Sequence, residues 1–357
     1  MNSNTSLEQY FQKYREQVIG IDQEFESPDG KKRIVYADWT ASGRMYGPIE
    51  KIMMEKVAPY VANTHTETTI TGSTMTKAYH EALNSVKRHV NAGPEDVIIS
   101  GNSGMTGVVN KFQRILGLKA HEKYKECIQR SHPDIPVVFV THMEHHSNQT
   151  TWLEALVDLE VIPATEEGLV DLEGLKNLLI KYGHRKTKIA AVTSCSNVTG
   201  IVTPYYEIAE IMHKNGGCCF VDFAASAPYM DIDMHPENPD QALDAIYFSP
   251  HKFLGGPGSS GILIFNRKFY NNKIPDNPGG GTVDWTNPWG EHKYVEDIEA
   301  REDGGTPGFL QAIRVALSIK LKEDMGVENI LKREKEMMKI LWEGLTAIPG
   351  LHILAGN

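Results

Sequence analysis

The chain is poor in cysteine and has no long apolar run. Its 357 residues include four cysteines, Cys127, Cys195, Cys218 and Cys219, and none forms a CxxC pair. This usage argues against a disulfide framework and indicates reduced thiols, as in a cytoplasmic protein. No window of about 18 apolar residues occurs, so no transmembrane helix is expected. The N-terminus lacks the apolar centre of a signal peptide and is typical of an amphipathic helix.

Several common nucleotide and metal motifs are also missing. There is no GxxxxGK[ST] loop, no GxGxxG turn after a first strand and no HExxH helix, which counts against a nicotinamide cofactor and a zinc site. His145 and His146 are adjacent and would diverge on an extended segment, so no metal is expected there. The 36 Lys and Arg against 46 Asp and Glu give a net charge of −10. We therefore expect no extended surface for nucleic acid or an anionic membrane.

Short β-branched runs alternate with helical patterns through most of the chain. Helices are expected at 171–182 and 205–214, and buried strands at 137–141 (VVFVT), 189–193 (IAAVT), 218–221 (CCFV) and 245–248 (AIYF). This alternation predicts an α/β fold with a mostly parallel sheet covered on both faces. The strand expected at 261–265 (GILIF) follows a loop too short for a helical crossover, so it should run antiparallel to the strand before it.

Three regions are expected along the chain, whose length is enough for a large domain and a smaller one. Residues 1–30 form an N-terminal arm, and residues 31–298 form the large domain. Residues 299–357 begin a small C-terminal domain, with helices at 309–325 and 327–348 and then the start of a strand.

Polar residues follow four of the predicted strands. These segments are 142–148 (HMEHHSN), 194–200 (SCSNVTG), 222–226 (DFAAS) and 249–261 (SPHKFLGGPGSSG). Ligands of open α/β sheets bind beyond the carboxyl ends of the strands. The four segments therefore predict one crevice that is lined by polar side chains.

Two residues of this crevice suit an aldehyde cofactor. The Lys252 amine can form an imine with an aldehyde, especially where desolvation lowers its pKa; taken alone, it is typical of an exposed loop lysine. Asp222 ends an apolar strand, where an unpaired carboxylate is costly. A pyridinium nitrogen would be a suitable partner, although a helix N-cap or a core ion pair would explain Asp222 equally well.

A histidine and a glycine-rich turn complete the candidate site. One imidazole of His145 and His146 could stack on a cofactor ring and move protons near neutral pH. Residues 101–107 (GNSGMTG) precede a helical segment, so their backbone N–H groups could bind a phosphate. The same residues also suit a simple turn and N-cap.

As a set, the motifs EHHSN, SNVTG, VDxAxS, SxHK and GGG resemble the class V aminotransferase family, specifically its cysteine desulfurase and selenocysteine lyase branch, from about Tyr36 to Pro307. The resemblance implies fold type I, the aspartate aminotransferase fold, and the cofactor pyridoxal 5'-phosphate (PLP). It implies an enzyme that acts on a small amino acid, with sulfur or selenium elimination favoured over transamination. A PLP-binding fragment without turnover is the non-catalytic alternative. Family members are usually homodimers with the site at the subunit boundary.

The resemblance also implies a role for each motif residue. Lys252 would bind PLP covalently, Asp222 would contact the pyridine nitrogen, and His145 would stack on the ring and take part in acid–base steps. The other cofactor contacts implied are Asn197 near the cofactor hydroxyl and the substrate carboxylate, and Met105, Thr106, Ser249 and His251 at the phosphate. The GGGT stretch at 279–282 resembles a segment near the subunit boundary.

Two departures from the family pattern stand out. Desulfurases usually carry a Gln, bonded to the phenolic oxygen of the cofactor, where this chain has Ala225. In the family, the persulfide cysteine and an arginine that binds the substrate carboxylate lie in the small domain. None of the four cysteines matches that position, so we expect both residues beyond Asn357 and a truncated small domain.

Overall fold

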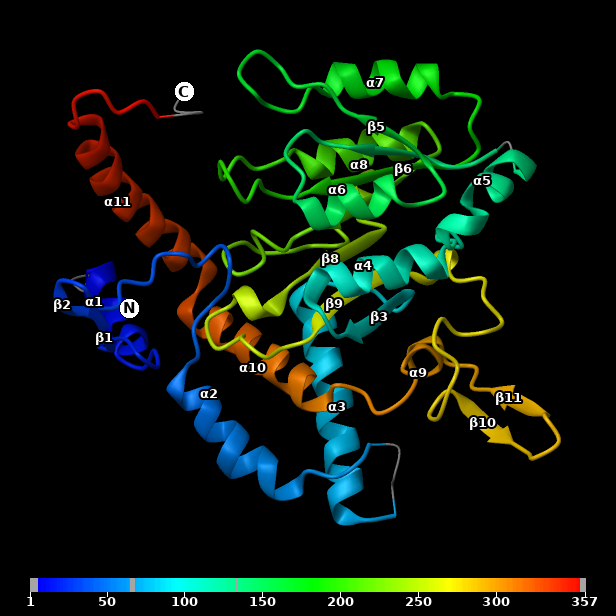
Figure 1. Ribbon diagram of the computed structural model, residues 1–357, viewed down its shortest axis with the longest axis horizontal. Helices are drawn as coiled ribbons and strands as arrows, with labels where there is room; N and C mark the ends of the chain where they lie inside the picture. The colour runs from blue at the N-terminus through cyan, green and yellow to red at the C-terminus, as the bar shows by residue number, and fades with distance from the viewer. Residues whose placement is uncertain (1–5, 65–67, 133, 354–357) are drawn as a thin grey trace.

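The computed structural model describes residues 6–64, 68–132 and 134–353. At its centre is a seven-stranded sheet with the order β3-β9-β8-β7-β6-β4-β5, and helices lie on both of its faces (Figure 1). Neighbours among β4 to β8 pair in parallel. β9 runs antiparallel to both β3 and β8. The predicted α/β fold with a mostly parallel sheet is confirmed.

Five strands of the sheet fall where the apolar runs predict them, whereas β3 and β5 were not predicted from the sequence. They are β3 (Asp96–Gly101), β4 (Val137–Val140), β5 (Asp158–Val161), β6 (Lys188–Thr193), β7 (Cys218–Asp222), β8 (Ala245–Phe248) and β9 (Gly261–Asn266). β8 and β9 form the antiparallel pair expected from the short loop between them, with Ala245 opposite Phe265. Two small hairpins lie outside the sheet: β1 (Glu24–Ser27) with β2 (Gly30–Arg33), and β10 (Val283–Thr286) with β11 (His292–Tyr294).

The α-helices of the described residues include each of the predicted ones, with ends shifted by up to two residues. They are α1 (Leu7–Arg15), α2 (Gly47–Ile52), α3 (Ile70–His89), α4 (Gly104–Ile115), α5 (Glu122–Ser131), α6 (His146–Leu153), α7 (Leu172–Lys181), α8 (Tyr205–Lys214), α9 (Ile298–Glu302), α10 (Phe309–Met325) and α11 (Val327–Thr346). No helix of the described residues is both long enough and apolar enough to cross a membrane.

The sheet separates two apolar cores. Residues of α3, α7, α8 and α10 pack on one face, and residues of α4 and α6 pack on the other. Adjacent side chains of β7 alternate between the faces, so Cys219 joins the first core and Cys218 the second. All four cysteines are free. Because both faces are covered, the central strands are apolar throughout and their polar neighbours lie at the strand ends.

The N-terminal helix α1 contacts the C-terminal end of α10. In α1, the hydroxyl of Tyr14 donates to Asp324 O at 2.9 Å and that of Tyr10 donates to Met325 O at 3.0 Å. α11 continues from this point, and none of its residues is fully buried. Residues 351–353 form no strand, and the rest of the strand predicted there lies outside the described residues. The division into an arm, a large domain and a small domain stays a prediction.

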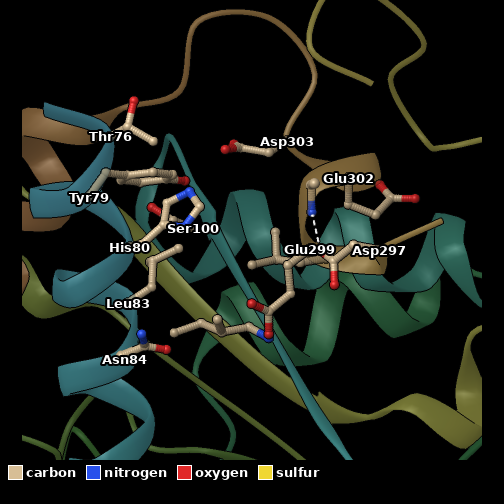
Figure 2. Close-up of a pocket in the computed structure, with 13 residues that line it drawn as sticks. Thr76, Tyr79, His80, Leu83, Asn84, Ser100, Asp297, Glu299, Glu302 and Asp303 are labelled. Carbon is tan, nitrogen blue, oxygen red and sulfur yellow. Dashed lines mark hydrogen bonds between the residues drawn. The ribbon is translucent and has the colours of Figure 1, made fainter. Parts of the chain in front are cut away.

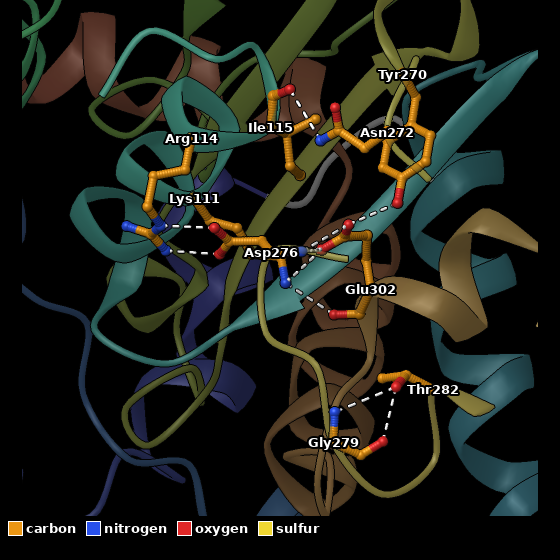
Figure 3. A network of polar contacts seen from close by, with 9 residues as sticks. All are labelled: Lys111, Arg114, Ile115, Tyr270, Asn272, Asp276, Gly279, Thr282 and Glu302. Atoms are coloured by element: carbon orange, nitrogen blue, oxygen red, sulfur yellow. Dashed lines mark hydrogen bonds and ion pairs between the residues drawn. The ribbon is translucent and has the colours of Figure 1, made fainter. Parts of the chain in front are cut away.

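A buried ion-pair network anchors the segment before α9 against α4 (Figure 3). The carboxylate of Glu302 pairs with Lys111 Nζ at 2.9 Å and accepts the hydroxyl of Tyr270 at 2.7 Å. Arg114 donates two hydrogen bonds, of 2.7 and 2.8 Å, to Asp276. The GGGT stretch follows within a few residues, and Thr282 closes it by donating from Oγ1 to Gly279 O at 2.7 Å. The network therefore fixes where this glycine-rich stretch lies.

Candidate functional site

Lys252 lies in a tight turn between β8 and β9, which we call the Lys252 turn (residues 249–256). Its centre is a short 3-10 helix, Pro250–Lys252. A Cβ on Gly256 would lie 1.9 Å from Pro250 O, and one on Gly43 would lie 2.0 Å from Phe253 O. Gly43 N also donates to His251 O at 2.9 Å. The turn is therefore held by close backbone contacts that only glycine allows.

A cavity of about 610 Å3 opens beside this turn. Seven predicted site residues line it: Met105, Thr106, His145, Asn197, Ser249, His251 and Lys252. Asp222 is 2% exposed, and Ala224, which donates its N–H to Asp222 Oδ1 at 2.8 Å, contributes to the lining. The structure thus brings together the four strand ends that the sequence pointed to.

Sequence reasoning missed several polar residues that line the same cavity. Asp38 and Thr40 come from residues 36–43 (YADWTASG), the segment at which the family resemblance begins, and Ser147 comes from EHHSN. Ser103, just before α4, also lines the cavity. The first three belong to motifs that had marked the resemblance, so those motifs were the available signal. What the sequence could not give was the direction of each side chain.

One end of the cavity is rich in hydrogen-bond donors. Met105 N, in the first turn of α4, donates to Ser249 Oγ at 2.8 Å. The hydroxyl of Thr106 donates to Ser147 Oγ at 2.7 Å. His251 Nδ1 lies 3.2 Å from Ser42 Oγ, and burial lowers the pKa of this histidine. A helix N-terminus with hydroxyls around it is suited to an anion such as a phosphate.

The half-buried amine of Lys252 lines the cavity, and the buried carboxyl of Asp222 lies behind the lining residue Ala224. Burial raises the pKa of Asp222 to about 7, against the opposing effects of its bond from Ala224 N and the charge of Lys252. Burial lowers the pKa of Lys252, while Asp222 and Asp38 oppose that shift. A cationic ring nitrogen beside Asp222 would favour its charged form, and a less basic Lys252 is a better nucleophile near neutral pH. Both residues therefore fit an aldehyde cofactor with a basic ring nitrogen.

Glu144 and Asn148 hold the start of α6, the helix for which His145 is the N-cap. Glu144 Oε1 accepts Thr141 Oγ1 at 2.6 Å and Thr193 N at 2.9 Å. Asn148 Nδ2 donates to Glu144 Oε2 at 2.7 Å. Glu144 and Asn148 had no role predicted from the sequence, yet together they join β4 and β6 to the helix that carries the histidine.

The protonation state of His145 follows from its hydrogen bond at the N-terminus of α6 and from its lowered pKa. Its Nδ1 accepts the N–H of Ser147 at 3.1 Å at the start of α6. Burial, and then the charge of Lys252, lower the pKa of its ring. The imidazole is therefore neutral near pH 7 with its proton on Nε2. A neutral ring on the cavity wall suits stacking against a planar ligand.

A second cavity, of about 540 Å3, lies between α3 and α9 (Figure 2). Tyr79 and His80 face it from α3, and Glu299 and Asp303 face it from the other side. Its lining includes none of the predicted site residues. Within the described part of the chain, no group of three or more His, Cys, Asp or Glu could hold a metal ion.

The sequence is similar to that of known proteins over most of its length. The family model described as aminotransferase class-V matches residues 35–357. A probable cysteine desulfurase of Staphylococcus aureus is 31% identical over 326 residues, which cover 90% of this chain and 73% of the relative. The corresponding protein of Staphylococcus epidermidis matches with the same identity and coverage.

Solved structures support the same fold. A cysteine desulfurase from Thermococcus onnurineus superposes with a TM-score of 0.75 at 24% identity, over 95% of this chain and 82% of that one. The cysteine desulfurase CsdA from Escherichia coli superposes with a TM-score of 0.71 at 19% identity, over 95% and 78%.

Proposed function

The chain belongs to the class-V aminotransferase family, and on that premise we propose that it is a PLP-dependent enzyme of the cysteine desulfurase type. The observation that carries the proposal is that Lys252 lines the cavity and lies close enough to the buried Asp222 for the charge of each to affect the pKa of the other. The relatives named as probable cysteine desulfurases support the choice of reaction. The substrate is a small amino acid, with cysteine the first to test.

Each part of the cavity has a function in holding the cofactor. Asp222 binds the pyridine nitrogen, because a buried carboxyl with a raised pKa is stabilised by a cationic partner. The ring lies against His145, and Asn197 is near the cofactor hydroxyl. The phosphate is held by the first turn of α4 and nearby polar side chains, namely Met105, Thr106, Ser249 and His251.

In the reaction, the side chains of Lys252 and His145 are the groups that transfer protons. When bound, PLP supplies an electron sink for the bonds at the substrate Cα. Lys252 Nζ, made less basic by burial, holds the cofactor and can take or return the Cα proton once released. His145 is neutral and offers its second ring nitrogen to the cavity, so it can move a proton at the reacting side chain.

The decisive experiment measures binding and reaction separately. Protein loaded with PLP should absorb in the visible range, and borohydride reduction should fix the cofactor on Lys252, as peptide mass mapping would establish. Lys252→Ala should lose this label and at least about 100-fold in turnover. Alanine and sulfide release from cysteine supports a desulfurase, whereas keto-acid-dependent amino transfer supports an aminotransferase. Protein that binds no PLP would contradict the proposal.

We also propose a homodimer in a reducing, cytoplasmic setting. The four free cysteines are consistent with reducing conditions. The GGGT stretch at 279–282 resembles the family segment near the subunit boundary, and its anchoring by the Glu302 network supports a fixed role there. Light scattering of the purified PLP-loaded protein should give twice the chain mass, and a monomer at micromolar concentration would contradict the dimer.

A further inference from the structure

Lys322, on α10, is among the largest fully buried side chains of the protein and is only 1% exposed. Its Nζ donates to Met230 O and lies 3.2 Å from His89 Nε2. The same atom lies 5.8 Å from the centroid of the Phe253 ring, within the range of a cation–π contact. Lysine is almost never fully buried unless it has partners, and here the ammonium has three.

The hydrogen bonds of His89 indicate which groups carry the protons. Burial, and then the charge of Lys322, lower the pKa of His89, so its ring is neutral. Its Nδ1 lies 2.8 Å from Glu323 Oε1 and donates to that carboxylate. Nε2 is therefore an acceptor for Lys322. A carbonyl oxygen, a ring nitrogen and an aromatic face are the surroundings that a charged ammonium needs.

Two of the three partners of Lys322, Phe253 and Met230, belong to the segments that carry the two central residues of the site. Phe253 directly follows Lys252 and is 1% exposed. Met230 ends the turn that begins at Asp222, and its N–H donates to Ser226 O at 3.0 Å. Lys322 thus contacts both segments from a helix that lines neither end of the cavity.

We propose that Lys322 is a positioning residue: its ammonium ties the Lys252 turn, through Phe253, to the Met230 end of the segment after Asp222, and so fixes Lys252 relative to Asp222. The proposal rests on the proposed function, in which these two residues hold PLP. It assigns Lys322 no contact with the substrate or the cofactor.

The cost of burying the Lys322 amine distinguishes a positioning role from a role in stabilising the fold. Burial lowers the pKa of Lys322 to about 8, although Asp231 and Glu323 oppose the shift. With the neutral His89, these are the titratable groups that face the amine. Because the charged amine is less stable in the folded protein than in water, its burial costs stability below the ordinary lysine pKa of about 10.4, and the cost is complete below pH 8. An apolar side chain of similar size would be as stable or more stable there.

The test compares Lys322→Met with Lys320→Met, its matched control on the same helix. The Lys320 side chain is 70% exposed and pairs only loosely with Asp324, at 3.4 Å. In PLP-loaded protein at pH 7, Lys322→Met should melt at the same temperature as the parent or higher. Its kcat should fall roughly tenfold or more, since small misplacements of reacting groups are costly, and KM should change less. Lys320→Met should match the parent.

A second readout uses cofactor-free protein. Hydrogen–deuterium exchange should rise in residues 249–256 and 224–230 of Lys322→Met but not of Lys320→Met. Unchanged kcat and exchange, or activity losses that simply follow a lower melting temperature, would overturn the proposal. If Lys322→Met does not fold, hydrogen–deuterium exchange of the parent is measured at pH 7 and at pH 9.5, on either side of the Lys322 pKa. After correction for intrinsic exchange rates, the protection of residues 249–256 and 224–230 should be lower at pH 9.5. Unchanged protection would overturn the proposal. If the parent does not bind PLP, the proposed function is wrong. The exchange test would still be valid, because it uses cofactor-free protein.

Discussion

Ser249 Oγ accepts a hydrogen bond of 2.8 Å from Met105 N, which joins the Lys252 turn to the first turn of α4. These residues lie 144 positions apart in the chain. The bond holds together the two segments that are proposed to bind the phosphate of PLP, so the anion site depends on both β8 and α4.

Ser249→Ala should weaken PLP binding. A hydrogen bond to a charged group contributes about 1.5–3 kcal/mol, so we expect the dissociation constant to rise by roughly 10- to 100-fold. Titration of cofactor-free protein with PLP measures the change. Ser131→Ala, at an exposed position in the last turn of α5, serves as the control. Equal PLP affinity in the two variants would contradict the assignment of Ser249 to the phosphate site.

Asp222→Asn should change the pH dependence of the free energy of unfolding and should also lower turnover. In the unfolded chain this carboxyl loses its proton near pH 4, whereas the folded protein holds it to about pH 7. Between these values the folded state binds more protons, so the contribution of Asp222 to the free energy of unfolding falls as pH rises. Urea denaturation of cofactor-free protein should reveal this fall in the parent but not in Asp222→Asn. Turnover of the PLP-loaded variant should drop on the order of 100-fold or more. A variant that denatures with the same pH dependence as the parent would contradict the assignment.

His145→Gln should lower kcat by about 100-fold or more if the ring acts in proton transfer. His146→Gln is the matched control, because His146 is the next residue but is exposed. Steady-state kinetics with cysteine would distinguish them. If the two substitutions had equal effects, the acid–base role would have to be moved to another residue.

Glu302→Gln should destabilise the fold by roughly 3–5 kcal/mol, because it leaves the buried Lys111 ammonium without its ion-pair partner. Urea denaturation at pH 7 measures the loss. Glu95→Gln, in an exposed pair with Arg267, should change stability by no more than about 0.5 kcal/mol. A small effect at Glu302 would mean that the network in Figure 3 does not anchor the glycine-rich stretch.

The sheet and most of the site could be predicted from the sequence because both follow from local patterns. Apolar runs locate β4, β6, β7 and β8, and in a parallel sheet their carboxyl ends meet at one edge. The glycines around Lys252 likewise marked a tight turn. Position along the chain was therefore enough to predict that Lys252, His145 and the segment that begins at Asp222 meet at one cavity.

The supporting residues could not be predicted because their environment comes from tertiary packing. Lys322 lies in a helix with several other charged residues and looks exposed in sequence, yet α3 and the Lys252 turn enclose it. Glu144 stands in a polar segment, and only the pairing of β4 with β6 brings Thr193 N to its carboxylate. Burial of this kind depends on contacts between residues distant in the chain.

Because β9 runs back along β8, the loop that carries Lys252 leaves and re-enters the sheet through adjacent hydrogen-bonded strands. Such a loop is held at both of its ends, because movement of either end would break hydrogen bonds of the β8–β9 pair. Insertions in this loop would displace residues that line the cavity, such as Ser249 and Lys252. Protein engineering that seeks new specificity here has room to vary the surrounding helices and the N-terminal segment, while the length of this one connection must stay constant.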